Sequence, residues 1–207
     1  MRLAIIVSTF PPYQGGMGNV AHQEARFLAL GGHEVVVFVP RGARDRAADN
    51  EKLLYEIVEL SAIITIGNAA VVPALFMVPR GFDAVHLHFP FFGGALFAAL
   101  GARFYRVPLT LTYHMDAVSK GWRGFIFKLL LKLVAPVIFS VAEKIRVSTL
   151  DYARTSPYLA SVLARQPRKI QEIPFALPEL AKSTKSSTPF LPDKGYFIFV
   201  GGLDRAH

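Results

Sequence analysis

The 207-residue sequence contains no cysteine. Disulfide bonds, thiolate metal sites and a cysteine nucleophile are therefore excluded, and this composition fits a reducing compartment. The N-terminus, "MRLAIIVSTFPP", also lacks an apolar run long enough for a signal peptide, and it predicts a first β-strand instead. We therefore expect a cytoplasmic protein.

Long uninterrupted apolar segments are absent as well. Residues 62–78 carry no charge but contain glycine, asparagine and proline, and they fall short of the ~20 residues that a membrane-spanning helix needs. Residues 125–142 include Lys128, Lys132 and Pro136, so spanning a membrane would bury two lysines. We expect neither segment to cross a membrane.

The residues that are present favour a folded α/β domain. Hydrophobic residues make up 52% of the chain, enough for a sizeable core. Apolar runs typical of buried parallel strands alternate with helical patterns, which predicts a Rossmann-like parallel sheet with helices on both faces. The expected strands are "RLAIIVST", "HEVVVFVP", "FDAVHLH", "VPLTLTYH", "KIRVST" and "KIQEIPF", and the expected helices cover about 17–30, 91–105, 121–142 and 150–165.

A change of composition near residue 178 predicts a domain boundary. Residues 178–194 hold three prolines and many small polar residues without an apolar period, which is typical of a linker. Residues 195–207 begin with the strand-like "GYFIFVGG". We therefore expect one domain over residues 1–177, a linker, and the first strand and turn of a second domain that is truncated at residue 207.

The positive charge is concentrated in the second half of the chain. The net charge is +8, and residues 101–207 carry 16 basic and 7 acidic side chains. Within 119–146, basic residues alternate with aromatic ones, and the candidates for contact with an anionic membrane surface are Trp122, Arg123, Lys128 and Lys132. A solvated basic helix with its leucines packed inward is the alternative. No nucleic-acid-binding motif accompanies the charge, so we expect no nucleic-acid partner.

A glycine-rich loop follows the first predicted strand. "GMGNVA", residues 16–21, fits the G-x-G-x-x-A pattern in which glycines let a diphosphate approach a helix N-terminus. An NADP-binding site is one alternative, with Arg41 and Arg44 near a phosphorylated ribose, although the second strand ends without the acidic residue that NAD requires. Glycines that serve only the turn are the other alternative.

Polar residues gather at the predicted carboxyl ends of the strands, where doubly wound sheets place their sites. His86 and His88 are two apart on one strand and share a face. His114 ends the next strand and Asp116 follows it. A metal site made by these four residues is one interpretation, and packing of His86 or His88 in the core is another. We favour the lining of a cleft, in which Asp116 binds hydroxyls of a ligand, acts as a base or caps the following loop.

Several motifs, in their order and spacing, resemble glycosyltransferase family 4, whose members are retaining, nucleotide-sugar-dependent enzymes of GT-B fold. The resemblance covers nearly the whole chain. The motifs are "STFPPYQGGMGNVAHQEARFLALGGHEVVVFVP", "FDAVHLHFP", "TLTYHMDA", "IRVSTLDYAR" and "YFIFVGGLDR".

The resemblance implies that this chain is the N-terminal, acceptor-side domain of a two-domain enzyme. It implies that Gly15 and Gly16 form the loop that approaches the donor diphosphate and the acceptor, and that His114 hydrogen-bonds the transferring sugar. Ser148 and Thr149 match a family position that contacts acceptor or caps the following helix, and the resemblance makes His86, His88 and Asp116 candidates for the acceptor cleft. The family's donor-binding arginine is replaced by Gly202.

We therefore predict a glycosyltransferase that moves a hexose from a nucleotide sugar to a lipid-linked or carbohydrate hydroxyl. The donor is a substrate, and no cofactor or metal is expected. The chain alone should be inactive, and the complete enzyme should be cytoplasmic or peripheral on the inner membrane face. The alternatives are a fragment of an NADP-binding oxidoreductase and a non-catalytic binding domain.

Overall fold

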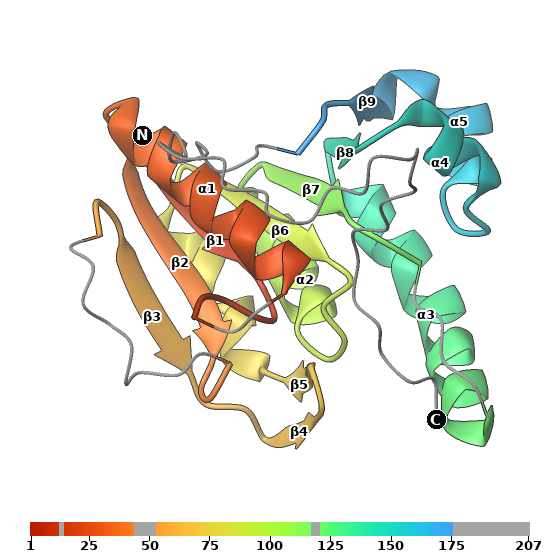
Figure 1. The fold of residues 1–207 in the computed structure, drawn as a ribbon, viewed down its shortest axis with the longest axis horizontal. Helices are drawn as coiled ribbons and strands as arrows, with labels where there is room; N and C mark the ends of the chain where they lie inside the picture. The colour runs from red at the N-terminus through yellow and green to blue at the C-terminus, as the bar shows by residue number, and fades with distance from the viewer. Residues whose placement is uncertain (13–14, 44–52, 117–120, 176–207) are drawn as a thin grey trace, which may run out of the picture. The chain divides into compact units, whose positions relative to one another are not determined.

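A computed structural model describes residues 1–12, 15–43, 53–116 and 121–175, with side chains of the helix that begins at residue 121 described from Lys128 onward. The predicted linker and second-domain strand, 178–207, lie outside the described residues. The described part forms a seven-stranded parallel sheet in the order β3-β2-β1-β6-β7-β8-β9 (Figure 1). The predicted fold class is confirmed.

The strands of this sheet and the helices follow the predicted alternation. The strands are β1 (Arg2–Ile6), β2 (Glu34–Pro40), β3 (Glu56–Leu60), β6 (Ala84–Phe89), β7 (Leu109–Tyr113), β8 (Lys144–Val147) and β9 (Ile170–Glu172). The α-helices are α1 (Gly16–Leu30), α2 (Ala95–Tyr105), α3 (Gly121–Val141), α4 (Leu150–Thr155) and α5 (Ala160–Arg165).

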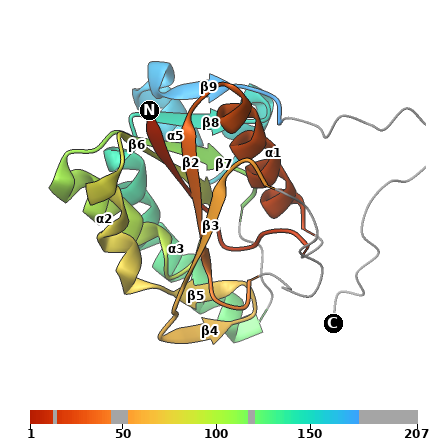
Figure 2. The same ribbon diagram turned by 90° about the vertical axis from the view of Figure 1, so that its left-hand side faces the viewer.

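Two apolar layers hold helices against the sheet. On one face, α1 buries Met17, Ala21 and Ala25 against side chains of β1 and β2. On the other face, α2 and α3 bury their apolar sides against the alternate side chains of the strands, among them Leu87 and Leu111. Figure 2 shows α1 on one side of the strands and α2 with α3 on the other.

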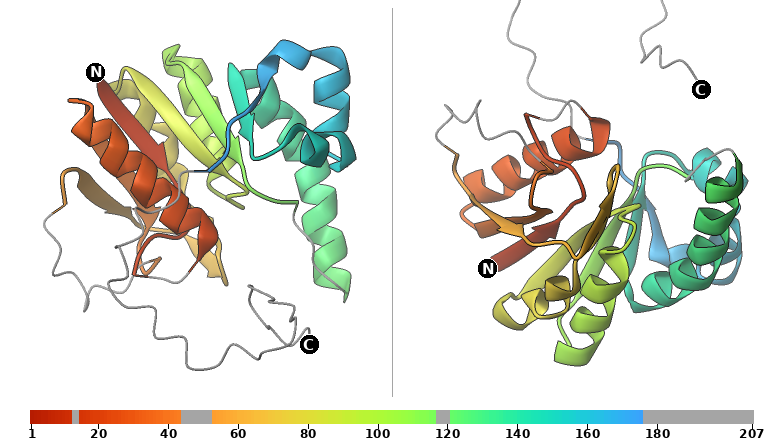
Figure 3. Two further views of the ribbon diagram at one scale, coloured as in Figure 1. Left: turned by 45° about the horizontal axis from the view of Figure 1, so that its top comes forward. Right: turned by 90° about the horizontal axis from the view of Figure 1, so that it is seen from below.

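The strand order reverses between β1 and β6, because β2 and β3 lie on one side of β1 and the later strands on the other. Figure 3 shows β3 near one end of the sheet and α4, α5 and β9 near the other. In open parallel sheets, the crevice at such a reversal, outside the carboxyl ends of the strands, is where ligands bind.

The segment 150–165 differs from the prediction. It forms two short helices, because Ser156 adopts an extended conformation (φ −67°, ψ 126°) between α4 and α5. Pro157 explains the break, since the residue before a proline is driven away from helical backbone angles. The single predicted helix is therefore wrong.

The uncharged segment 62–78 folds into the antiparallel hairpin of β4 (Ile64–Ile66) and β5 (Ala69–Val71), followed by a 3₁₀ turn, Pro73–Phe76. The next 3₁₀ turn is Val78–Gly81, and a third, Pro167–Lys169, precedes β9. None of the helices in the described part of the chain has the length and apolarity to cross a membrane.

Candidate functional site

The N-terminus of α1 begins where the glycine loop ends. Gly15 is its N-cap residue, with an extended backbone, and no side chain among the described residues caps the helix. The first N–H groups of a helix have no partner within the helix, so an uncapped N-terminus offers them to an anion. A Cβ atom added at Gly16 would meet no atom of the described residues outside its own helix turn within 4 Å, so the space next to it is open in the described part of the chain.

Gly18, the second glycine of the G-x-G-x-x-A pattern, has a different role. A Cβ atom there would lie 2.7 Å from the carbonyl oxygen of Thr9 and 3.0 Å from the Cα atom of Phe10. Gly18 therefore lets α1 pack against the loop that follows β1. In the G-x-G-x-x-A pattern, Gly16 therefore lies at an open site, whereas Gly18 is required by packing.

The histidines belong to a polar row on the face of the sheet that α1 covers. Parallel pairing places His88 beside Thr112 and Thr112 beside Arg146. His114 continues this face just beyond β7, and its backbone N–H donates to the Phe89 carbonyl oxygen at 2.9 Å. The structure thus brings His86, His88 and His114 together, as the sequence predicted.

Glu24 of α1 and Arg146 of β8 complete this cluster, and sequence reasoning missed both. Glu24 Oε2 lies 3.2 Å from His88 Nε2 and 3.4 Å from His86 Nε2, and Glu24 Oε1 pairs with Arg146 Nη1. Helical periodicity alone could have placed Glu24 on the face of α1 that carries Met17 and Ala21, but nothing in the sequence pairs it with the histidines.

Hydrogen bonds fix the rings of the histidines. His86 bonds the hydroxyls of Thr110 and Thr112 through Nδ1 and Nε2, at 2.7 and 2.8 Å. His88 Nδ1 lies 2.8 Å from His114 Nε2, and the two rings meet edge to edge, with centroids 5.1 Å apart and planes 24° apart. Phe175 packs against His114 at a centroid distance of 4.8 Å.

Burial and neighbouring charges shift the pKa values of this cluster. Burial lowers the pKa of His86 to about 4 and that of His114 to about 3, with repulsion from His88 adding to both. Burial alone would raise the pKa of Glu24, but the close approach of His88, followed by those of His86 and Arg146, lowers it to about 2. The cluster therefore holds an ionised carboxylate beside neutral His86 and His114 rings.

Three potential metal ligands meet in this cluster. Ligand atoms of Glu24, His86 and His88 lie within 4.8 Å of one another, a spacing that a metal ion could bridge. This set shares only two residues with the metal interpretation of the sequence, since Glu24 stands in place of His114 and Asp116. Arg146 already neutralises Glu24, and we therefore interpret the cluster as an ion-paired contact between α1 and the sheet.

Asp116 belongs to a separate network. Its Oδ1 accepts hydrogen bonds from the hydroxyls of Tyr113 at 2.6 Å and Ser156 at 2.7 Å. Its backbone N–H donates to the Tyr152 hydroxyl oxygen at 2.6 Å. Burial raises the pKa of Tyr113, so that hydroxyl remains a donor. This network ties the end of β7 to α4, and a role of Asp116 in binding acceptor stays a prediction.

Ser148 lies directly after β8 and is partly buried. The neighbouring Thr149 is the N-cap of α4, and its hydroxyl accepts from the Tyr152 N–H at 3.2 Å. Thr149 therefore has the capping role that the sequence offered as an alternative, whereas contact of Ser148 with acceptor stays a prediction.

The leucines of α3 differ from expectation. Leu131 is buried, but Leu129 and Leu130 are each 50% exposed and Leu133 is 66% exposed, so inward packing does not account for them. Lys128 and Lys132 are exposed as predicted. The side chains of Trp122 and Arg123 are not among those that the structure describes, and Arg44 also lies outside the described residues.

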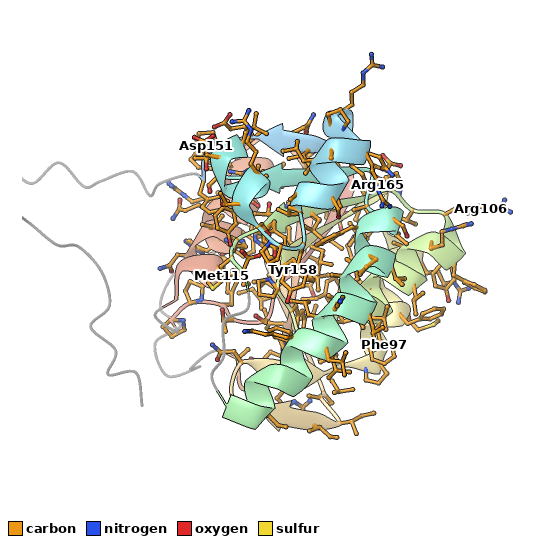
Figure 4. All side chains as sticks on the ribbon, turned by 90° about the vertical axis from the view of Figure 1, so that its right-hand side faces the viewer. Phe97, Arg106, Met115, Asp151, Tyr158 and Arg165 are labelled. Atoms are coloured by element: carbon orange, nitrogen blue, oxygen red, sulfur yellow. The ribbon has the colours of Figure 1, made fainter. Side chains whose placement is uncertain are left out.

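An apolar pocket of about 320 Å³ lies beside these leucines. Its walls come from the β4–β5 hairpin, the segment from β6 into α2, and α3. Figure 4 shows Phe97 of α2, one of its lining residues, next to α3. Other lining residues are Ile64, Ile66, Val71, Phe91, Leu96, Leu130, Leu131 and Val134.

Comparisons with known proteins agree with this architecture. The family model of Glycosyltransferase Family 4 matches residues 14–165. A GDP-mannose-dependent alpha-mannosyltransferase of Corynebacterium glutamicum is 33% identical over 128 residues, covering 58% of this chain and 30% of that protein.

Solved structures of Anabaena HepE share the fold. The complex with UDP-glucose superposes with a TM-score of 0.60 at 13% identity, covering 86% of this chain and 44% of HepE. The complex with UDP and glucose gives a TM-score of 0.55 at 11% identity, covering 86% and 45%. The chain thus spans less than half the length of these relatives.

The fold and the polar carboxyl edge of the sheet define a Rossmann-like domain of the GT-B type. Because the family model covers more than half of its length, the chain belongs to glycosyltransferase family 4.

Proposed function

We propose that this chain is the acceptor-side domain of a retaining glycosyltransferase that moves a hexose from a nucleotide sugar to a hydroxyl group. The observation that carries the proposal is the hydrogen-bonded contact between His114 and the buried His88 at the carboxyl edge of the sheet. Because β1 is parallel to β6, the glycine loop that follows β1 begins at the same edge. This edge belongs to a family 4 domain. Family membership favours a transferase over the NADP oxidoreductase and the non-catalytic binding domain.

The chemistry assigns different work to the two parts of the site. When the sugar bond breaks, negative charge grows on the leaving diphosphate and positive charge on the sugar. The free N–H groups at the uncapped N-terminus of α1 stabilise negative charge without reorganising, which is how oxyanion sites act. A neutral His114 provides a hydrogen bond to the sugar without adding a cation beside the developing positive charge.

The names of the relatives support a nucleotide sugar as the donor. The Corynebacterium relative is named for GDP-mannose, and HepE is solved with UDP-glucose. Because these relatives extend well beyond the matched part, we propose that most donor contacts come from a second domain, and that the 207 residues alone do not transfer sugar.

The test uses the protein expressed from its complete gene. A panel of nucleotide sugars that includes GDP-mannose and UDP-glucose is screened for release of the nucleoside diphosphate in the presence of sugar or lipid acceptors. We expect one donor to be consumed, and product NMR should show the anomeric configuration of the donor retained. Absence of release with every donor would remove the transferase assignment, whereas an inverted product would remove only its stereochemistry.

We further propose that the acceptor is lipid-linked and that the apolar pocket holds its hydrocarbon chain. An apolar hollow of this size would stay poorly hydrated, and small-molecule sites commonly have about this volume. Leu130 lies at its wall and is half exposed, and α3 also presents Lys128 and Lys132. An acyl or prenyl chain with an anionic headgroup matches this combination of apolar and basic groups.

Leu130 and Leu133 form a matched pair for testing the pocket. Both are exposed on α3, but only Leu130 is among the lining residues. We expect the 207-residue chain to bind the fluorescent probe 11-(dansylamino)undecanoic acid, Leu130→Asp to weaken binding at least tenfold, and Leu133→Asp to leave it within about twofold. Equal loss in both variants would mean that the probe meets the helix surface and not the pocket.

Peripheral binding at the inner membrane face is part of the same proposal. Vesicles containing phosphatidylglycerol should bind the chain more tightly than neutral vesicles, and Lys128→Glu combined with Lys132→Glu should remove the difference. Equal sedimentation with both vesicle types at low salt would contradict the membrane role.

A further inference from the structure

We propose that Glu24 and His88 are positioning residues that fix the tautomer of His114 through a carboxylate–histidine–histidine relay. The effect of this relay on a bound sugar rests on the proposed function, whereas the contacts that form the relay do not depend on it. Glu24 Oε2 lies 3.2 Å from His88 Nε2, and His88 Nδ1 lies 2.8 Å from His114 Nε2. Two ring nitrogens in contact must share one proton, so the question is which ring carries it.

The buried end of the relay decides the tautomer of His88. His88 is 0% exposed, and its Nε2 finds no well-aligned hydrogen-bond acceptor among the described residues. The carboxylate oxygen of Glu24 nevertheless faces it at ion-pair distance. An unprotonated Nε2 would set its lone pair against those of an anionic oxygen, which is repulsive in a water-excluded site. The proton of neutral His88 therefore lies on Nε2.

The charge count favours neutral His88 over the imidazolium. Arg146 pairs with the second carboxylate oxygen of Glu24, so the charges of these two side chains already cancel. His86, the other titratable group that faces Glu24, is bonded to two threonine hydroxyls. A second proton on His88, which is itself fully buried, would give the cluster a net positive charge, and uncompensated buried charge is costly.

The tautomer of His114 follows from that of His88. With its proton on Nε2, His88 offers Nδ1 only as an acceptor, and His114 Nε2 must donate to it. The remaining nitrogen of His114, Nδ1, then carries a lone pair. No hydrogen bond to a described residue occupies this Nδ1, and the ring as a whole is only partly buried.

This arrangement gives His114 one function toward a sugar. A lone pair at Nδ1 accepts a hydrogen bond from a hydroxyl and repels a carboxylate. The relay therefore favours transfer of a sugar with a free hydroxyl at the position His114 contacts, over the corresponding uronic acid. The hydrogen bond to His88 at the ring's edge and the packing of Phe175 against the ring fix its orientation, so that the lone pair keeps its direction.

Through-hydrogen-bond NMR tests the relay in the 207-residue chain. With ¹⁵N-labelled histidine, we expect one slowly exchanging proton bonded to His114 Nε2, with a nitrogen–nitrogen coupling to His88 Nδ1. Glu24→Gln keeps the side-chain shape but removes the charge, and it should speed exchange of that proton at least tenfold. Thr110→Val is the matched control, because Thr110 bonds His86 and should leave the coupling unchanged.

The outcomes separate this inference from the proposed function. A proton located on His88 Nδ1, or no coupling in a folded chain, would overturn the relay whether or not the enzyme transfers sugar. If Glu24→Gln fails to fold, the wild-type coupling and the assignment of its proton still decide the question. An intact relay in a complete protein without transferase activity would instead overturn the function.

Discussion

Gly16 and Gly18 are two residues apart on α1, but the structure gives them opposite responses to the same substitution. In Gly18→Ala, the new methyl group would lie 2.7 Å from the Thr9 carbonyl oxygen and 3.0 Å from the Phe10 Cα atom, both of them backbone atoms that a rotamer change cannot move. In Gly16→Ala, the methyl group meets no atom within 4 Å among the residues that the structure describes outside the same turn of helix.

The expected free energies follow from these contacts. Overpacking of this kind costs about 1–3 kcal/mol, and the gain in helix propensity from glycine to alanine returns at most about 1 kcal/mol. Gly18→Ala should therefore lose up to about 2 kcal/mol, which lowers the thermal midpoint by up to about 8 °C for a domain of this size. Gly16→Ala has no opposing cost, so its midpoint should stay unchanged or rise.

Thermal unfolding of both variants, followed by far-ultraviolet circular dichroism beside the wild type, measures the difference. The native far-ultraviolet spectrum before heating is the control for folding. If Gly18→Ala unfolded at the same temperature as Gly16→Ala, the packing role assigned to Gly18 would be wrong.

Three further predictions concern the same site. In the protein from the complete gene, Gly16→Val should abolish donor consumption while the thermal midpoint stays within about 2 °C of wild type, and wild-type turnover would mean that this glycine serves only the turn. Because the pKa of Glu24 is lowered from 4.5 to about 2, its stabilising contribution is present above about pH 4.5 and lost as the pH falls toward 2. The stability deficit of Glu24→Gln should accordingly shrink between pH 6 and pH 3 in denaturant titrations, and a constant deficit would argue against an ionised pair. A chelator should leave the thermal midpoint unchanged, and a clear decrease would support a metal ion at Glu24, His86 and His88.

Much of the fold follows from local patterns in the sequence. The strands around Ile5 and Val37 are continuous apolar runs, the strand around Leu111 alternates leucine with threonine, and the turn at Gly31 ends α1 where the periodicity stops. The short edge strand β3 and the β4–β5 hairpin were not predicted, because their half-exposed residues give no strong alternation. The break at Ser156 was missed although Pro157 marks it.

The candidate site was predictable only where its residues share a strand or a motif. His86 and His88 are two apart and His114 ends the next strand, so parallel pairing alone brings them together. Glu24 and Arg146 are 122 residues apart in the sequence, and their meeting depends on how α1 lies across the sheet. The exposed and the buried leucines of α3 are the same residue type, so their identity in the sequence does not distinguish Leu130 from Leu131. Only the packing in the structure does so.

The central claim is that the edge holding His114 belongs to a sugar-transferring cleft. The most direct measurement is the turnover of the preferred nucleotide sugar by the complete protein and by its His114→Ala variant, with thermal unfolding as the control for folding. We expect turnover to fall by roughly a hundredfold or more, as for loss of one positioned polar group at a transition state, with little change in stability. Undiminished turnover in the variant would contradict the assignment of His114, and turnover by residues 1–207 alone would contradict the need for a second domain.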